Sequence, residues 1–154
     1  MRLKTFLLTE FVTKPDADQF VSKWKMRLKT YGITHIEFST HFFVDRMNHS
    51  RNKPPVSIEE MDSMLESFFN KVGSQFKKDV EAVKSHSLKP RGKNKGALNY
   101  NELEIAMYNK KSGIKFVIVL KQDRKQKGTA MVLPVTIVRD KNKLIHTQGE
   151  LIEV

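Results

Sequence analysis

The chain has 154 residues, 39% of them hydrophobic, and carries 28 Lys and Arg against 17 Asp and Glu, for a formal net charge of +11. This length and hydrophobic content predict one folded domain over residues 1–154 and exclude a disordered chain. Since the chain has no Cys, disulfides and thiolate metal sites are excluded as well.

The N-terminal stretch, residues 1–12, has a short apolar core that Glu10 interrupts, and no small-residue cleavage site follows it. We therefore expect no signal peptide. No run in the chain approaches the roughly 18 apolar residues that a membrane span needs. These features favour a soluble intracellular protein of the cytoplasm that does not contact a membrane.

Two helices are predicted in the first third of the chain. Residues 15–32, "PDADQFVSKWKMRLKTYG", predict a helix that starts at Asp16 or Asp18, has apolar residues four apart and stops at Gly32. Residues 38–51, "FSTHFFVDRMNHSR", predict a second helix that starts near Ser39 or Thr40. Its apolar positions Phe43 and Met47 are also four apart.

A third helix is predicted after the prolines at 54 and 55. Ser57 and Glu60 have the spacing of a capping box, and a run of Met and Phe at helical spacing follows them. Either Gly73 ends this helix, or the helix continues after a kink through "SQFKKDVEAV".

Residues 84–99, "KSHSLKPRGKNKGALN", predict a basic, mobile loop, because they contain no acid, two Gly and one Pro. Two interpretations remain open for this loop. It is either an arm that follows the phosphates of a nucleic acid or a solvated linker. The residues proposed to bind nucleic acid are Lys89, Arg91, Lys93 and Lys95.

The rest of the chain is typical of an antiparallel meander, with strand-like runs separated by the turns "KKSG", "DRKQKG" and "DKNK". In one run, Met131, Leu133, Val135 and Ile137 alternate with Ala130, Val132, Thr136 and Val138. Pro134 inside that run indicates an edge strand or a bulge. The expected fold is α+β, with two to three N-terminal helices packed on one face of a C-terminal antiparallel sheet of about four strands.

The charge is uneven along the chain. Residues 1–80 carry 13 cations and 10 anions, whereas residues 81–154 carry 15 cations and 7 anions. A basic domain attracts polyanions, and nucleic acid is the commonest polyanion inside a cell. We therefore expect contact with a nucleic acid, although the same charge could serve solubility alone.

The second predicted helix concentrates groups that could cleave RNA. A His41 in the first turn of a helix is disfavoured as a cation, so it is suited to accept a proton as a general base. Arg46 and Arg51 could stabilise the charge on a phosphorane during attack by a 2′-hydroxyl. The alternative is a hydrogen-bonded His beside surface arginines. Because the tight motifs of nucleotide, zinc and two-metal enzymes are missing, we expect neither a metal nor a cofactor.

Residues 35–76, from "HIEFSTHFFVDRM" to "FFNKVGSQF", resemble the His-x-x-x-x-Arg helix and the following helix of the RegB-type endoribonucleases of T4-like phages. The wider group is the RelE/barnase-like toxin fold. The resemblance implies that His41 is the first catalytic His and Arg46 the Arg that follows it. The family's second His falls on or beside Phe69, which cannot transfer a proton. Candidates for the missing acid are His146, His86, His49 and Lys121; in analogy with RelE-like proteins, Lys121 and Arg139 could contribute from the strand ends.

Two functions are therefore expected as alternatives. The first is a metal-independent endoribonuclease that cleaves single-stranded RNA by 2′-hydroxyl attack. It would be encoded by a phage, act in the bacterial host and process mRNA that a ribosome could present. The second is a non-catalytic protein of the same fold that binds nucleic acid or takes over a host protein with an acidic surface. The sequence does not indicate which oligomeric state the protein has.

Overall fold

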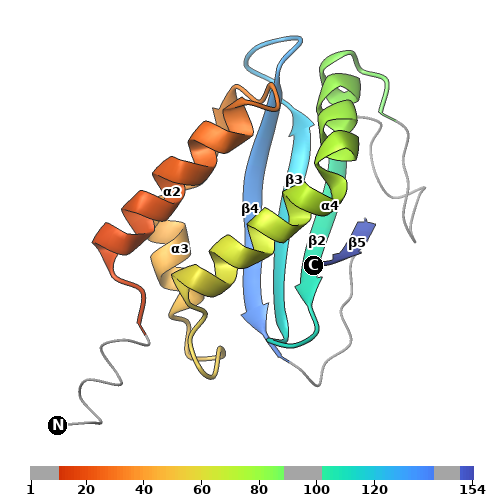
Figure 1. Ribbon diagram of the computed structural model, residues 1–154. Helices are drawn as coiled ribbons and strands as arrows, with labels where there is room; N and C mark the ends of the chain where they lie inside the picture. Colours follow the sequence, from red (N-terminus) through yellow and green to blue (C-terminus); the bar gives the residue numbers. More distant parts are fainter. Residues whose placement is uncertain (1–10, 89–101, 141–149) are drawn as a thin grey trace, which may run out of the picture.

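The computed structural model describes residues 11–88, 102–140 and 150–154. Over these residues the chain forms three helices and five strands, and the helices lie on one side of a single mixed sheet (Figure 1). The predicted α+β class is therefore confirmed. None of the described helices is long and apolar enough to cross a membrane.

Helix α2 (Lys14–Lys29) begins earlier than the sequence suggests. Its N-cap residue is Thr13, whose hydroxyl accepts a hydrogen bond from the backbone N–H of Asp16. The expected start at Asp16 or Asp18 is wrong because Pro15 fits the first turn of a helix, which leaves the cap to the threonine before it.

Helix α3 (Thr40–Met47) begins where the sequence predicts. Ser39 is the N-cap residue, and its hydroxyl accepts a hydrogen bond from the backbone N–H of Phe42 at 3.1 Å. Phe43 and Met47 are both fully buried, one turn apart. These two side chains anchor the short helix, so its remaining faces are free to carry polar groups.

Helix α4 (Ile58–Lys84) begins with the predicted capping box. The backbone N–H of Glu60 donates to Ser57 Oγ, and the backbone N–H of Ser57 donates to the Glu60 carboxylate, both at 3.1 Å. The helical backbone is interrupted at Val72, where φ is −128° and ψ is 15°. Of the two alternatives that the sequence left open, the structure has the kinked helix that continues.

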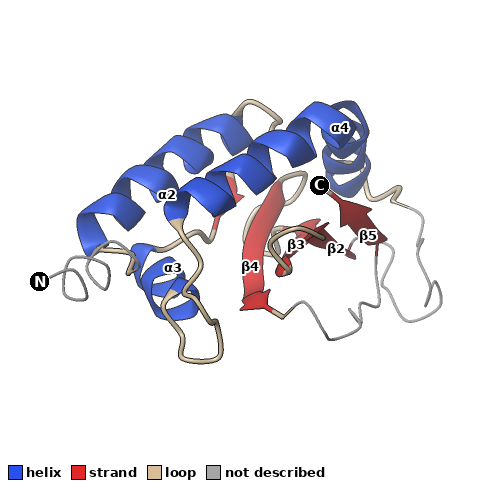
Figure 2. Ribbon diagram, turned by 60° about the horizontal axis from the view of Figure 1, so that its bottom comes forward, coloured by secondary structure: helices blue, strands red, loops and turns tan. Residues whose placement is uncertain are grey.

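The five strands form one sheet in the order β1-β4-β3-β2-β5 (Figure 2). The pairs β2–β3 and β3–β4 are antiparallel, as expected, but β1 pairs parallel with β4 and β5 pairs parallel with β2. The antiparallel meander is therefore wrong at both edges. The edge strands are too short for their side-chain pattern to specify a partner or a direction. The strands are β1 (His35–Ile36), β2 (Glu102–Asn109), β3 (Ile114–Gln122), β4 (Ala130–Arg139) and β5 (Glu150–Glu153).

Strand β4 contains the irregularity that Pro134 predicts. Its register with β3 shifts there, and Val135 is the extra residue of a bulge. The bulge ends the simple alternation that the sequence suggested, because Ile137 packs in the core with Ala130 and Val132 whereas Val135 is 42% exposed. The bulge thus turns the last part of β4 and its terminal arginine toward the helices.

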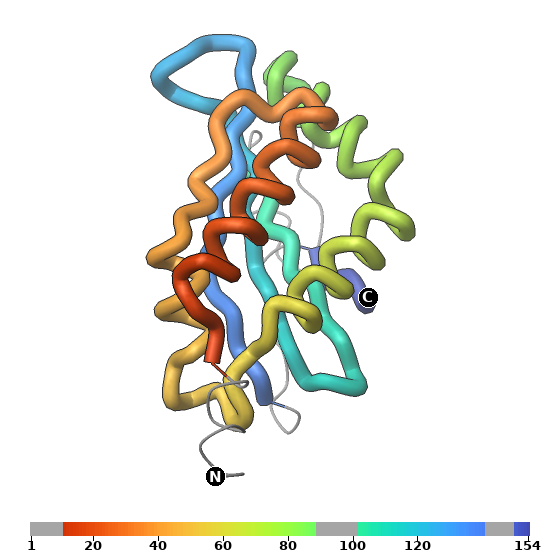
Figure 3. The backbone as a smooth tube through the Cα atoms, turned by 60° about the vertical axis from the view of Figure 1, so that its left-hand side comes forward, coloured from red at the N-terminus to blue at the C-terminus, as the bar shows by residue number. Residues whose placement is uncertain are grey.

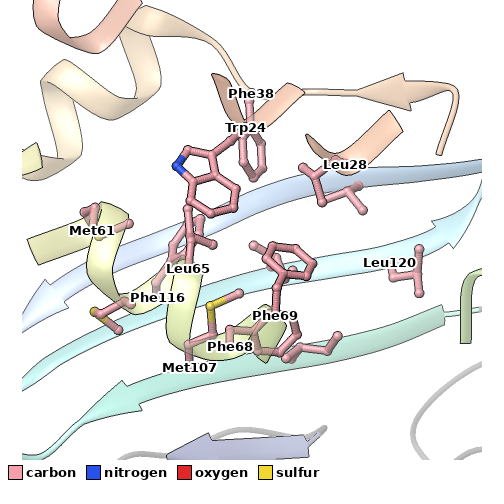
Figure 4. Packing of buried hydrophobic residues seen from close by; sticks show 14 of the residues in the cluster. Trp24, Leu28, Phe38, Met61, Leu65, Phe68, Phe69, Met107, Phe116 and Leu120 are labelled. Carbon is pink, nitrogen blue, oxygen red and sulfur yellow. The ribbon is translucent and has the colours of Figure 1, made fainter. Parts of the chain in front are cut away.

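The core lies between the helices and one face of the sheet. Helix α4 crosses β2, β3 and β4, and α2 lies beside α4 (Figures 1 and 3). The centre of the core is aromatic: Phe69 stacks on Trp24 at 5.7 Å and on Tyr31 at 4.8 Å between ring centroids. Figure 4 shows Trp24 of α2 and Phe69 of α4 packed in one cluster with Phe116 and Leu120 of β3.

Candidate nucleic-acid interface

His41 and Arg46 leave α3 in different directions. His41 lies in the first turn and is exposed, and it makes no hydrogen bond or ion pair among the described residues. Arg46 lies five residues further on, which is about 140° around the helix axis at 3.6 residues per turn. Its guanidinium carbon lies 5.3 Å from the centre of the Phe42 ring. The two side chains therefore do not converge on one point.

Arg51 lies in the loop after α3 and reaches β4. Its Nη2 donates hydrogen bonds to Thr136 Oγ1 at 3.0 Å and to the Ile137 carbonyl at 3.2 Å. The next residue, Asn52, is 2% exposed and accepts a hydrogen bond from the backbone N–H of Arg139 at 2.8 Å. These contacts fasten the loop to the sheet and bring Arg51 and Arg139 to the same end of β4.

The guanidinium group of Arg139 is held by hydrogen bonds within the fold. It makes five guanidinium hydrogen bonds: Nε donates to the Pro54 carbonyl, Nη1 to Glu60 and the Ser112 carbonyl, and Nη2 to the Pro55 carbonyl and Glu60. Burial raises the pKa of Glu60, but the hydrogen bonds and charge of Arg139 and the Ser57 backbone N–H outweigh it and hold that pKa below its ordinary value of 4.5. Because every N–H of the guanidinium is engaged, Arg139 has no free donor for a phosphate.

Lys121 lies at the opposite end of the sheet from Arg139. In the β3–β4 ladder Lys121 pairs with Met131, whereas Arg139 pairs with Ile114. Positions 114 and 121 are separated along β3 by about 23 Å at roughly 3.3 Å per residue. Lys121 is therefore too far from Arg139 to share one phosphate with it.

The resemblance would place a second histidine on or beside Phe69, and the Phe69 side chain is 6% exposed inside the aromatic core. It has no access to a substrate. Of the other candidate proton donors, His49 Nδ1 accepts a backbone hydrogen bond at 3.2 Å, His86 follows the end of α4, and His146 lies outside the described residues.

A second group of basic side chains collects at the end of the sheet that contains Lys121. The C-terminal ends of α2 and α4 and the β3–β4 hairpin all lie at this end of the molecule (Figures 1 and 3). The hairpin contributes three exposed cations, Arg124, Lys125 and Lys127. We call this part of the molecule the basic end; it consists of these three residues together with Lys25, Lys29 and Lys121.

The described residues on both sides of the segment 89–101 contact β3 next to the basic end. After the segment, Glu102 pairs with Lys121 in the sheet. Before it, His86 Nδ1 lies 3.4 Å from Oε1 of Gln122 in β3. The described residues carry 20 cations and 16 anions, or +4, so most of the net charge of +11 belongs to the other parts of the sequence. The cations Lys89, Arg91, Lys93 and Lys95 lie outside the described residues.

A groove of about 270 Å³ lies between α2 and β1, lined by Lys25, Lys29, Thr34, His35 and Ile36. In it, His35 Nε2 lies 2.7 Å from Glu37 Oε1, and Nδ1 lies 3.7 Å from Asp123 Oδ2. His35 is not among the site residues that the sequence predicts. The available signal was its spacing of two residues from Glu37 in "ITHIEF", because residues two apart in an extended segment share a face.

No protein-family model, curated protein or solved structure matches the chain.

A larger cavity, of about 390 Å³, lies between the first turns of α2 and α4, and its wall includes Asp16, Glu59 and Asp62. That acidic wall does not suit a polyanion. Within the described ranges there is no group of three or more His, Cys, Asp and Glu side chains placed to hold a metal ion.

Proposed function

We propose that the protein binds single-stranded RNA through its basic end. The observation that carries this proposal is the convergence of cations from α2, β3 and the β3–β4 hairpin at the end where the chain enters and leaves the segment 89–101. Lys29 and the three hairpin cations are exposed, and Lys25 and Lys121 are half-buried. Lys and Arg that neutralise phosphates release bound counterions, which makes such binding favourable and sensitive to salt. The RNA would be mRNA in the cytoplasm, free or presented by a ribosome.

The test is fluorescence anisotropy with a labelled 12-nucleotide RNA over a series of KCl concentrations. We expect the triple variant Arg124→Gln, Lys125→Gln, Lys127→Gln to flatten the slope of log K against log salt by about 2 units, at about 0.7 per lost contact. The matched control removes three exposed cations at the opposite end, through Lys14→Gln, Lys53→Gln and Lys111→Gln. Equal flattening by both variants would show that only net charge matters.

Cleavage of the bound RNA is a second candidate function, and the exposed His41 favours it. An exposed imidazole in the first turn of a helix, with no hydrogen-bond partner in the described part of the chain, can accept a proton from a 2′-hydroxyl. Incubation with total RNA in EDTA, followed by mapping of new 5′-hydroxyl ends, tests this function. We expect His41→Ala to abolish the new ends and keep RNA binding, while His49→Ala keeps both. Cleavage that requires a divalent metal would exclude this reaction.

A protein with an acidic surface, of the kind found in a host, is the alternative partner of the basic end. It would also bind in a salt-dependent manner. Competition separates the two partners, because RNA binding at the basic end must be displaced by unlabelled RNA. If the wild-type protein shows no salt-dependent affinity for the labelled RNA, the proposed function is wrong.

A further inference from the structure

Helix α2 carries two pairs of basic residues on two different faces. Lys23 and Arg27 face α4, where acids neutralise them: Lys23 Nζ lies 2.8 Å from Asp62 Oδ1, and Arg27 hydrogen-bonds to Glu66. The hydrogen bond to Asp62 raises the pKa of Lys23, and the hydrogen bond from Arg27 lowers the pKa of Glu66. The charges on this face of α2 are therefore balanced within the fold.

Lys25 and Lys29 lie on the other face, which lines the groove beside β1. Among the described residues, neither ammonium group has a carboxylate within 4.0 Å. Two like charges at positions i and i+4 of a helix repel each other. An anion in the groove would remove this repulsion, whereas nothing within the described fold does so.

His35 completes the wall of the groove on the side of β1. Glu37 and Asp123 are the two acids at its ring, and the Glu37 contact at 2.7 Å holds Nε2. The Nδ1 contact with Asp123, at 3.7 Å, is longer than a hydrogen bond. With Nε2–H donating to Glu37, Nδ1 of the neutral ring has no proton to donate, so His35 forms part of the wall and the attraction for an anion comes from Lys25 and Lys29.

We infer that the groove between α2 and β1 binds a phosphate group of the RNA backbone through the ammonium groups of Lys25 and Lys29, with His35 in its wall. This inference rests on the proposed function for the identity of the ligand. Lysine ammonium groups bind phosphate as point charges. The volume of about 270 Å³ fits a phosphate with its sugar, and Thr34 and Ile36 form the uncharged part of the wall.

A polymer suits this groove better than a free nucleotide. The groove lies at the same end of the molecule as the β3–β4 hairpin, with its exposed Arg124, Lys125 and Lys127 (Figures 1 and 3). A strand with one phosphate in the groove can place the following phosphates along the hairpin. Among the described residues no Phe, Tyr or Trp lines the groove, so it offers no large aromatic platform for the bases and little sequence preference is expected.

The first test compares the double variant Lys25→Gln, Lys29→Gln with wild type in RNA binding. We expect the salt slope to flatten by about 1.4 units and the affinity in 0.1 M KCl to fall about 25-fold, at roughly fivefold for each contact. The matched control, Lys77→Gln with Lys78→Gln, removes two exposed charges from α4 and should keep most of the slope. Thermal melting checks that both variants are folded.

The second test follows the ring nitrogens of His35 by NMR, with inorganic phosphate and with the 12-nucleotide RNA. We expect both ligands to shift the His35 signals and to leave those of His49 unchanged. If wild type binds RNA and the double variant keeps its full salt slope, the groove inference is overturned while the proposed function stands. If phosphate shifts His35 but RNA does not bind, the ligand is a small phosphate compound and the RNA assignment fails.

Discussion

Arg139 at the end of β4 and Glu60 in the first turn of α4 form a two-point ion pair. Nη2 lies 2.5 Å from Oε1 and Nη1 lies 2.9 Å from Oε2, with side chains 10% and 32% exposed. Glu60 also accepts the backbone N–H of Ser57, so the same carboxylate caps α4 and binds the sheet. This pair joins the two layers of the fold at the end opposite the basic end.

We predict that Arg139→Gln lowers the free energy of unfolding by about 2–3 kcal/mol, because it leaves Glu60 and three carbonyls without their charged donor. The partial exposure of Glu60 keeps the loss below that of a fully buried pair. Urea unfolding measures the change, and Arg124→Gln, an exposed arginine of the hairpin, should stay within about 0.5 kcal/mol. Unchanged stability with lost RNA binding would instead assign Arg139 to the ligand.

The same pair predicts a dependence of stability on pH. The pKa of Glu60 in the folded protein is below the ordinary value of 4.5, so the folded state binds the proton less well than the unfolded state. The ion pair therefore contributes its full stabilisation at pH values above 4.5, and this contribution is lost as the pH falls through the folded pKa of Glu60. We expect the stability difference between wild type and Glu60→Gln to shrink as the pH is lowered from well above 4.5 to below it. A constant difference in urea unfolding across this range would contradict the assignment.

Local chemistry explains what the sequence predicts well. The capping box at Ser57, the N-cap at Ser39 and the bulge at Pro134 each depend on residues within a few positions of one another, and all three are present. The kink at Val72 was one of two alternatives, because a glycine next to it is compatible with a break or a stop. Elements of this kind can be predicted from the sequence before the fold is known.

Long-range pairing explains what the sequence does not predict. From the sequence alone, Arg139 looks like an exposed charge at the end of a strand. In the structure, the bulge in β4 directs its side chain toward Glu60, which is far away in the chain. Likewise, the contact of His35 with Asp123 exists only because β1 pairs with β4, and a two-residue strand has no pattern of its own. The composition shows that the chain is basic, but only the order of the strands shows where on the molecule the cations of the basic end lie.

The aromatic core predicts the effect of introducing a histidine at position 69, the position suggested by the RegB resemblance. Phe69→His would bury a polar ring between Trp24 and Tyr31 and remove the stacking at 5.7 and 4.8 Å. We expect a loss of about 3 kcal/mol in unfolding free energy and no new RNA cleavage. Denaturation and an assay for 5′-hydroxyl ends check both parts. New cleavage activity in this variant would support a RegB-like site after all.

The last prediction concerns the basic segment between α4 and β2 and separates it from the groove. Replacing Lys89, Arg91, Lys93 and Lys95 by Gln should flatten the salt slope of RNA binding by roughly two to three units, at about 0.7 per phosphate contact. The melting temperature should hardly change, because Lys and Arg side chains are rarely buried in a core and surface substitutions cost within about 0.5 kcal/mol.

Combining these four changes with Lys25→Gln and Lys29→Gln decides whether the segment and the groove contact separate phosphates. Independent contacts require the two reductions in slope to add, to about 4 units in total, because each neutralised phosphate releases its own counterions. If the combined variant loses no more than the segment variant alone, both sets contact the same phosphates. A segment variant with the full wild-type slope would make residues 89–95 a linker and leave binding to the groove and the hairpin.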